Sequence, residues 1–291
     1  MYTRLPFNKF ALVSLDDRCE VGCAFCFRAD RGADRMSVAL FARILSRLFE
    51  LGLRGVCLTG GEPANHPDFV EFVRLSRQFG MDCSVVSSAR EGRSLNVLQK
   101  AATLLNHVTI SADSMGAGIV GGVRRTPVDA AVALECMLPV MGSMHVVVWQ
   151  ITSEEAKELA SLARVSDFEM EFSPLYISNS LRDKLGLSID RYLQQLDADL
   201  AVLEQFFEIS ERLRNVVAKL KGRLDPTLQC ICESTRIYVS ADGYLRRCPY
   251  SESPVRVTQS RAEINAALAK LFQTALPCHL ACAAICREVV Y

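Results

Sequence analysis

An alternation of strand-like and helix-like stretches runs through the first 175 residues and limits the fold more than any other feature. Stretches with helical spacing separate short apolar stretches that have the composition of buried strands: Phe10–Leu15, Gly55–Leu58, Cys83–Val86, Val108–Ser111, Met144–Gln150 and Phe168–Phe172. Repeated strand–helix units are typical of a parallel sheet with crossover helices. We therefore predict an α/β fold, specifically a partial (β/α)6 barrel, since six strands are few for the closure of eight.

The pattern changes after the sixth predicted strand. Ser188–Leu220 predicts a long helical region, Thr235–Leu245 has the alternation and the Asp-Gly turn of a hairpin, and Ala262–Phe272 has helical spacing. We place a domain boundary near residue 222. Residues 1–221 would form the barrel with a trailing helix, and residues 222–291 a small cysteine-rich α+β extension. An extension of only ~70 residues builds a weak core, so a bound metal is a reasonable way to hold it together.

The charge balance excludes some classes of partner. Lys plus Arg and Asp plus Glu both total 33, so the formal net charge is zero. A protein that binds nucleic acid or a membrane surface mainly through charge is therefore not expected. No apolar run reaches the ~20 residues of a membrane span, and Met1–Phe10 lacks the long apolar segment of a signal peptide. We expect a cytoplasmic protein.

Twelve cysteines are distributed unevenly along the chain. In a reducing compartment so many thiols are not expected to form a disulfide framework. Cys57, Cys83 and Cys136 are scattered in apolar or strand-like contexts, and we interpret them as small core residues. The other nine form one group near the start and one in the last quarter: Cys19, Cys23 and Cys26, and then Cys230, Cys232, Cys248, Cys278, Cys282 and Cys286.

The first group of cysteines has the spacing Cys-x3-Cys-x2-Cys and follows the first predicted strand. Three thiolates in one short loop suit an iron–sulfur cluster or zinc. Because only three are local, a [4Fe–4S] cluster would keep one iron without a protein ligand, open to a small chelating molecule. A structural zinc site would need a fourth ligand. Asp30, Asp34 and the distant His66 do not have the spacing of a zinc finger.

A second feature, Thr59-Gly60-Gly61-Glu62-Pro63, ends the second predicted strand. Ligands bind at the C-terminal ends of parallel strands. Two glycines let the backbone approach a ligand closely, and the Glu62 carboxylate can accept from an ammonium group. An ordinary strand-to-helix turn is the alternative. Because the cysteines lie one β/α unit earlier, both loops are expected to open on the same face.

The segment VSLDDRCEVGCAFCF, Val13–Phe27, followed by GGEP, resembles the radical S-adenosylmethionine (SAM) superfamily. The resemblance covers about residues 8–175 and implies a partial (β/α)6 radical SAM barrel. It implies that the three early cysteines hold a [4Fe–4S] cluster whose open iron chelates the amino and carboxylate groups of SAM. It also implies that Gly60, Gly61 and Glu62 meet the SAM amino group, and that the backbone at Phe25 lies near the adenine.

Further SAM contacts follow from the same resemblance. Ser111 and Asp113 end the fourth strand, where the family often contacts the ribose, with an ordinary strand-end turn as the alternative. Arg124 follows two glycines where related members put a partner for the SAM carboxylate. The arginine after it is an equal candidate, and a solvated pair is the alternative. Ser87-Ser88 departs from the family, because many members carry Asn-Gly after the third strand, so the contacts of this loop stay open.

The tail pattern Cys232-x10-Gly243-x4-Cys248-Pro249 resembles the opening of the SPASM and twitch auxiliary-cluster domains. A hairpin with Gly243 at its turn would bring the cysteines at its base together. The last three cysteines, at i, i+4 and i+8, would share one face of a helix. Cys230 and Cys232 compete for the first position. We expect one auxiliary [4Fe–4S] cluster, with two incomplete clusters or a zinc knuckle as the alternatives.

The resemblance implies a radical oxidoreductase. An external one-electron donor such as flavodoxin or ferredoxin would reduce the first cluster, which cleaves SAM to methionine and a 5′-deoxyadenosyl radical. That radical removes a hydrogen atom from the substrate. The first strand begins by about residue 10, which leaves no room in this chain for a leader-recognition domain and favours a small molecule. We expect dehydrogenation or epimerisation, for example of an aminoglycoside-like secondary metabolite.

Two other functions stay open. A ribosomal-peptide maturase would form a thioether or carbon–carbon crosslink with the help of a separate leader-binding partner. A nonenzymatic zinc or iron–sulfur scaffold would carry its metal but would not make 5′-deoxyadenosine. No side chain is assigned as a general base, because His66 and Tyr176, the candidates near the active end, each have a structural alternative.

Overall fold

The computed structural model describes residues 10–26, 33–90, 92–122, 126–177, 179–221, 237–246 and 255–273. Within these ranges nine strands form one sheet in the order β6-β5-β4-β3-β2-β1-β7-β8-β9. The strands are β1 (Phe10–Ser14), β2 (Gly55–Thr59), β3 (Asp82–Ser87), β4 (His107–Asp113), β5 (Met141–Val148), β6 (Glu169–Pro174), β7 (Ile237–Val239), β8 (Tyr244–Arg246) and β9 (Val255–Arg256).

The first six strands are parallel, and each pairs with the next one along the chain, as Leu12 does with Cys57 and Ser111 with His145. The sheet is open, because β6 lies at one edge while β1 pairs with β7. The predicted α/β fold with six parallel strands, a partial barrel, is therefore confirmed.

The hairpin of the tail continues the sheet of the barrel. Val239 of β7 pairs in parallel with Val13 of β1 and antiparallel with Leu245 of β8. Gly243 lies at the turn with a φ of +85°, a backbone conformation that favours glycine. The predicted domain boundary near residue 222 stays a prediction, and the pairing of β1 with β7 crosses it.

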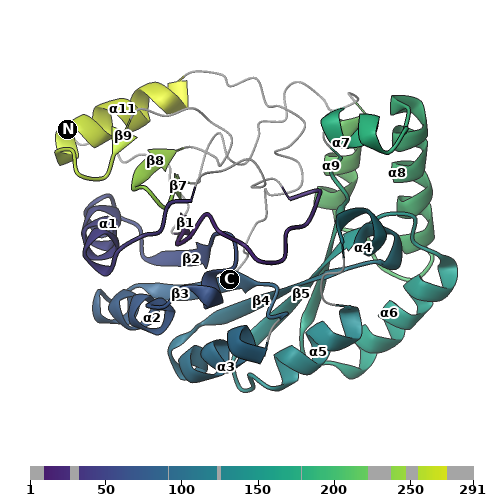
Figure 1. Ribbon diagram of the computed structural model, residues 1–291, viewed down its shortest axis with the longest axis horizontal. Coiled ribbons are helices and arrows are strands. Elements are labelled where there is room, and N and C mark those ends of the chain that lie inside the picture. The colour runs from purple at the N-terminus through teal and green to yellow at the C-terminus, as the bar shows by residue number, and fades with distance from the viewer. Residues whose placement is uncertain are drawn as a thin grey trace.

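The described helices are α1 (Val38–Glu50), α2 (Phe69–Gln78), α3 (Gly92–Ala101), α4 (Met115–Gly121), α5 (Pro127–Glu135), α6 (Ser153–Val165), α7 (Asn179–Lys184), α8 (Ile189–Leu203), α9 (Glu211–Leu220) and α11 (Arg261–Gln273), with short 3-10 turns η1 (Pro63–Asn65) and η2 (Ala102–Leu104). Helices α1, α2, α3, α5 and α6 cover the outer side of the six parallel strands, and the other helices lie elsewhere around the sheet (Figure 1).

Two helices differ from the expectation. The predicted Ser188–Leu220 region is broken into α8 and α9, because Ser210 starts a new helix by accepting a hydrogen bond from Leu213 N at 3.3 Å. The sequence predicts a helix over Pro127–Met141, but helix α5 ends at Glu135. Pro139 follows within four residues, and a proline cannot continue a helix because it lacks the backbone N–H.

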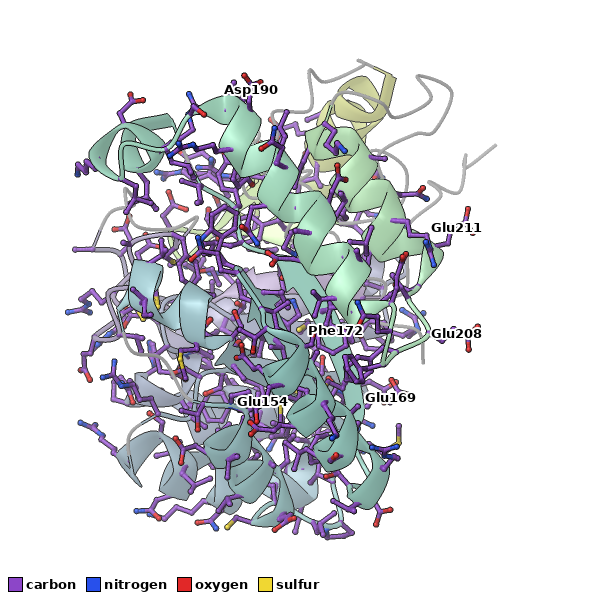
Figure 2. All side chains as sticks on the ribbon, turned by 90° about the vertical axis from the view of Figure 1, so that its right-hand side faces the viewer. Glu154, Glu169, Phe172, Asp190, Glu208 and Glu211 are labelled. Atoms are coloured by element: carbon purple, nitrogen blue, oxygen red, sulfur yellow. The ribbon has the colours of Figure 1, made fainter. Side chains whose placement is uncertain are left out.

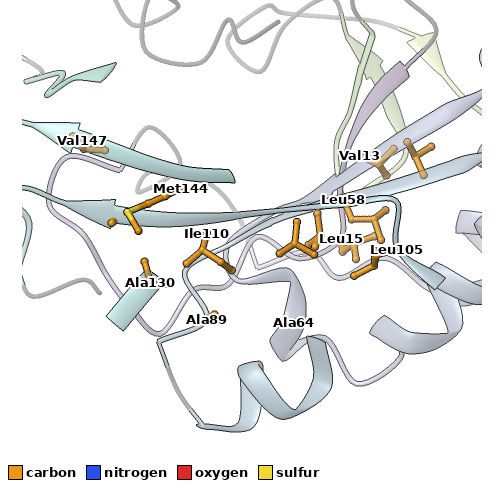
Figure 3. Close-up of a cluster of buried hydrophobic side chains, with 14 of the residues drawn as sticks. Val13, Leu15, Leu58, Ala64, Ala89, Leu105, Ile110, Ala130, Met144 and Val147 are labelled. Carbon is orange, nitrogen blue, oxygen red and sulfur yellow. The ribbon is translucent and has the colours of Figure 1, made fainter. Parts of the chain in front are cut away.

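The apolar core lies between the sheet and the helices (Figure 3). Alternate strand positions such as Val13, Leu58 and Ile110 are completely buried. The rings of Phe41 on α1 and Phe72 on α2 lie 4.7 Å apart and close this layer. Successive side chains of a strand point to opposite faces, so these apolar residues define the helix-covered face of the sheet.

The opposite face of the sheet is polar although it is buried. Thr109, Ser111 and Asp113 on β4 and Ser143 and His145 on β5 occupy the other set of alternate positions, and all are less than a tenth exposed. The hydroxyls of Thr109 and Ser143 lie 3.0 Å apart. Buried polar groups are normally hydrogen-bonded, so this face is better suited to a polar ligand than to an apolar one.

Helix α8 is joined to the end of β5 by Asp199. Its carboxylate accepts hydrogen bonds from Gln150 N and Ile151 N, both at 3.0 Å, and from Gln195 Nε2 at 2.8 Å. Gln150 needs this support, because its φ of +50° is unusual for a residue with a side chain. Burial raises the pKa of Asp199 to about 6 in spite of the three hydrogen bonds.

Replacing Asp199 by asparagine is expected to remove a pH dependence of stability. The pKa is about 6 in the folded chain against 3.8 for an unperturbed aspartate. The folded state therefore binds more protons between these values, and the free energy of unfolding falls as the pH rises from about 4 to 6, by up to about 3 kcal/mol. Urea unfolding across this pH range measures the difference between the two proteins. Asp190→Asn, an exposed position on the same helix, should keep the wild-type slope, and equal slopes in all three proteins would contradict the prediction.

Helices α8 and α9 form the side of the molecule that faces the viewer in Figure 2. Asp190 and Glu211, at the starts of the two helices, point outward there. Beneath them the rings of Phe172 on β6 and Phe207 lie 4.7 Å apart, edge to face. Among the described ranges, no helix has the length and apolar character that crossing a bilayer requires.

Candidate functional site

Two loops meet at the C-terminal ends of β1 and β2, as the sequence predicts. We call residues 16–26 the cysteine loop and residues 59–63 the glycine loop. Gly61 N donates to Asp16 O at 2.6 Å, and Glu62 N donates to Arg18 O at 3.3 Å. The glycine loop therefore lies directly on the backbone that leads into Cys19.

The two glycines are required for this contact. A Cβ on Gly61 would lie 1.8 Å from Arg18 O and 2.8 Å from the Cβ of Cys19. A Cβ on Gly60 would lie 2.6 Å from Asp16 O, and its φ of +147° is unfavourable for other residues. From the sequence, the two glycines are expected to let a ligand approach the backbone closely. The structure shows that they also let the cysteine loop approach it closely.

The three cysteines lie in the cysteine loop, and the last two share a turn. Gly22 has a φ of +62°, and Cys26 N donates to Cys23 O at 2.9 Å. Cys23 is buried, Cys26 is half-buried and Cys19 is exposed. Although Cys19 is exposed, desolvation by the atoms around its thiol raises the pKa of that thiol. The nearby Glu62 and Cys26 add to this, while the N–H groups of Val21 and Gly22 oppose it.

Three thiolates in one loop are a donor set that suits an iron–sulfur cluster. Within the ranges that the structure describes, no three His, Cys, Asp or Glu side chains converge on one metal position. A [4Fe–4S] cluster takes each thiolate on a different iron, so its ligands surround a larger body than one ion. The cysteine loop supplies three thiolates for such a cluster, and Gly60 and Gly61 beside that loop carry no Cβ.

Helix α4 supports the other side of the cysteine loop. Ala24 N donates to Gly121 O at 3.1 Å, and a Cβ on Gly121 would lie 2.0 Å from the ring of Phe25. The ring of Phe25 therefore occupies the space that a side chain at position 121 would take. Ser114 begins this helix and accepts a hydrogen bond from Ala117 N at 3.3 Å.

Asp16 fixes the start of the cysteine loop. Its buried carboxylate accepts from Arg18 N at 2.9 Å, from Arg18 Nε at 3.1 Å and from Arg35 Nε at 2.6 Å. Burial alone would raise the pKa of Asp16, but these hydrogen bonds and the charge of Arg35 hold it below its usual value. The carboxylate is therefore ionised at neutral pH, where it holds both guanidinium groups beside the loop.

The Glu62 carboxylate is bound by four donors of its own chain. Ser87 Oγ and Ala64 N donate to Oε1 at 2.6 and 3.1 Å. Ser88 donates to Oε2 through both Oγ, at 2.6 Å, and N, at 2.8 Å. We call these four hydrogen bonds the Glu62 brace. Sequence reasoning left the contacts of Ser87 and Ser88 open, and their departure from the family pattern was the signal that marked them.

The remaining predicted residues divide into two sets. Ser111 and Asp113 lie buried at the end of β4, on the polar face of the sheet. The other predicted ligands lie outside the described residues: Arg124, Arg125, Cys230, Cys232, Cys248, Cys278, Cys282 and Cys286.

His66 has a structural environment. It is buried, its Nε2 lies 3.0 Å from Met36 O, and its Nδ1 accepts from Asp68 N at 3.1 Å. Its ring also lies 4.7 Å from that of Phe72. Burial lowers the pKa of His66, and the ring joins the start of α2 to Met36, two residues before α1.

Residues 13–129 match the sequence profile of the Radical SAM superfamily. This region is a radical SAM domain. The matched range contains the cysteine loop, the glycine loop, the serines of β3 and all of β4. The predicted family is therefore confirmed for this region, while the resemblance of the tail to SPASM and twitch domains stays a prediction.

Curated relatives of the radical SAM domain include two PqqA peptide cyclases. That of Gluconobacter oxydans (strain 621H) is 29% identical over 121 residues, 39% of this chain and 33% of the relative. That of Rhodopseudomonas palustris (strain ATCC BAA-98 / CGA009) is 32% identical over 122 residues, 38% of this chain and 32% of the relative. The match thus spans about a third of the length of these relatives.

Solved structures extend the likeness of fold beyond the radical SAM domain. Streptococcus suis SuiB bound to its precursor peptide SuiA aligns with a TM-score of 0.64 at 14% identity, covering 92% of this chain and 66% of SuiB. Native anSMEcpe with bound AdoMet aligns with a TM-score of 0.60 at 14% identity, covering 91% and 80%. At this identity the likeness concerns the fold alone.

Proposed function

We propose that this chain is a radical SAM enzyme that abstracts a hydrogen atom from a peptide, as the first step of a thioether or carbon–carbon crosslink. The observation that carries the enzyme class is the cysteine loop, which lies against the Cβ-free edge of the glycine loop. The choice of a peptide rests on the relatives, which are named peptide cyclases, and on SuiB, whose structure contains a precursor peptide.

The small-molecule substrate expected from the sequence has less support than a peptide substrate. A leader-binding function on a separate protein is compatible with a peptide substrate. The relatives and SuiB then favour the peptide.

Cys19, Cys23 and Cys26 would hold a [4Fe–4S] cluster that binds SAM. When bound, the two groups supply a 5′-deoxyadenosyl radical, which takes a hydrogen atom from a C–H bond of the substrate. Gly60, Gly61 and Glu62 would bind the amino group of SAM. The buried Ser111 and Asp113 would bind its ribose, and Arg124 its carboxylate. The backbone at Phe25 would lie near the adenine.

The tail cysteines would bind one auxiliary [4Fe–4S] cluster. Four of Cys230, Cys232, Cys248, Cys278, Cys282 and Cys286 would be its ligands. The hairpin of β7 and β8 supports this proposal, because its pairing with β1 joins the tail to the same sheet as the cysteine loop. An external one-electron donor such as flavodoxin or ferredoxin would reduce the enzyme.

Anaerobic turnover tests the proposed function. The reconstituted full-length chain is incubated with SAM, a reductant and a peptide encoded beside its gene, with deuterium at the candidate crosslinking residues. We expect 5′-deoxyadenosine to form and to carry deuterium from the peptide. Formation of 5′-deoxyadenosine that gains deuterium from a deuterated aminocyclitol, and none from the peptide, would instead support the small-molecule reading. A protein that holds iron but makes no 5′-deoxyadenosine with either substrate would contradict the enzyme class.

A further inference from the structure

The Glu62 brace leaves the carboxylate without a free accepting position. An ionised carboxylate has about four lone-pair positions for hydrogen bonds. Glu62 uses four, on Oε1 and Oε2 alike, and its side chain is 3% exposed. The two hydroxyl contacts, at 2.6 Å, have the length of charge-assisted hydrogen bonds. A ligand ammonium could bind this carboxylate only by displacing one of its own donors.

We propose that Ser87 and Ser88 are positioning residues for SAM. They hold Glu62 so that the glycine loop presents its backbone, rather than the Glu62 carboxylate, to the SAM amino group. The inference rests on the proposed function, because it assigns the SAM amino group to this loop. It goes beyond the family pattern, from which the two serines depart.

A continuous set of contacts leads from the two serines to the cysteine loop. The Glu62 brace joins the end of β3 to the glycine loop. One residue before Glu62, Gly61 donates to Asp16 O and lies in contact with Arg18 and Cys19. A displacement of the carboxylate therefore shifts the backbone that lies on the cysteine loop. A misplacement of about 1 Å is enough to weaken binding and catalysis strongly.

Ser87 has two roles in the Glu62 brace. Its hydroxyl donates to Glu62 Oε1 and accepts from Ala89 N at 2.9 Å. Ala89 is buried and has a φ of +43°, so the turn after β3 depends on that acceptor. Removing the Ser87 hydroxyl thus leaves Glu62 Oε1 and Ala89 N each with one hydrogen-bond partner fewer. Removing the Ser88 hydroxyl leaves Glu62 Oε2 still bound by Ser88 N. Ser87→Ala should therefore weaken SAM binding more than Ser88→Ala does.

The experiment measures SAM binding and iron content in the reconstituted full-length chain. Ser87→Ala should raise the SAM Kd about tenfold, which corresponds to the ~1.4 kcal/mol expected for a weakened buried hydrogen-bond network. Ser88→Ala should raise it less, and Ser87→Thr, which keeps the hydroxyl, should restore most of the affinity. Iron content should equal that of the wild type, because all three early cysteines remain.

A second measurement does not need the cluster. Amide hydrogen exchange of the iron-free chain should be faster over residues 62–66 in Ser87→Ala than in the wild type, because Ala64 N loses its fixed acceptor. Ser76→Ala is the matched control, since Ser76 is a buried serine whose hydroxyl donates to Phe72 O within α2. That variant should change neither the SAM Kd nor the exchange of residues 62–66.

The outcomes separate this inference from the proposed function. Unchanged SAM binding in Ser87→Ala and Ser88→Ala, with wild-type iron, would overturn the inference alone. Tighter binding would also overturn it and would indicate that the Glu62 carboxylate contacts SAM directly. Loss of SAM binding in Ser76→Ala to the same degree would overturn it as well, because the effect would then be general destabilisation. A wild-type chain that holds iron but binds no SAM would overturn the proposed function together with the inference.

Discussion

Replacing Cys19, Cys23 and Cys26 together by alanine is expected to remove about four iron atoms per chain and to abolish SAM cleavage. The three thiols lie in the cysteine loop, whereas the other described cysteines, Cys57, Cys83 and Cys136, are far apart in the sequence. Iron would be counted after anaerobic reconstitution, and 5′-deoxyadenosine would be measured with reductant and SAM. A triple variant that keeps the full iron content would contradict the assignment.

The same experiment reports on the tail. If the wild type holds about eight irons and the triple variant about four, the tail binds its own [4Fe–4S] cluster. If the variant holds none, the tail cysteines bind zinc or are free thiols, and a redox-neutral reaction is expected instead of a net oxidation. Cys136→Ala is the matched control. The interpretation of Cys136 as a core residue was wrong, because it is an exposed cysteine at the end of α5, and its loss should change neither measurement.

Gly61→Ala is expected to have the largest effect of any single substitution in the glycine loop. The new Cβ would lie 1.8 Å from Arg18 O and 2.3 Å from Arg18 C, which are backbone atoms that cannot rotate away. The cysteine loop must therefore move. We expect a loss of about 2–3 kcal/mol in the free energy of unfolding, as for other overpacked sites, and a fall of about 100-fold in SAM cleavage, as for a misplaced reacting group. Urea unfolding and 5′-deoxyadenosine formation measure the two effects.

Gly118→Ala is the control for this substitution. Gly118 lies in α4, and a Cβ there would contact nothing within 4 Å. Alanine in a helix is favoured over glycine by up to ~1 kcal/mol, so this variant should be as stable as the wild type or more so, with unchanged SAM cleavage. Wild-type stability and SAM cleavage in Gly61→Ala would mean that the two loops are not in contact as described.

The barrel could be predicted from the spacing of apolar residues along the chain. Parallel strands and crossover helices each have a characteristic spacing within a short segment, and the two alternate. The strands β1 to β6 fall within a few residues of the predicted ranges. Helix α5 begins at Pro127, where the rigid ring of proline suits a first turn. The turn at Gly243 likewise follows from the Asp-Gly pair in the sequence.

Elements with weak local signals were not predicted. Helix α4 contains Gly116, Gly118 and Gly121, and glycine is a poor helix former. Two of these glycines are explained by tertiary contacts, since a Cβ on Gly116 would lie 2.2 Å from Trp149 O and one on Gly121 would meet Phe25. Glycine occurs at these two positions because distant segments pack closely against the helix there, and not because glycine favours a helix.

The amino-acid sequence contains the chemistry of the candidate site, because metal ligation needs particular residue types at short spacing. The cysteine triplet and the Gly-Gly-Glu motif are therefore readable without a structure. The partners of these motifs are not readable, because they come from strands and helices far along the chain. Ser87 and Ser88 bind Glu62 from 25 and 26 residues away, and Asp199 binds the end of β5 from 48 and 49 residues away. Such pairs carry no local pattern, and only the closing of the sheet and its helices brings their atoms within hydrogen-bond distance.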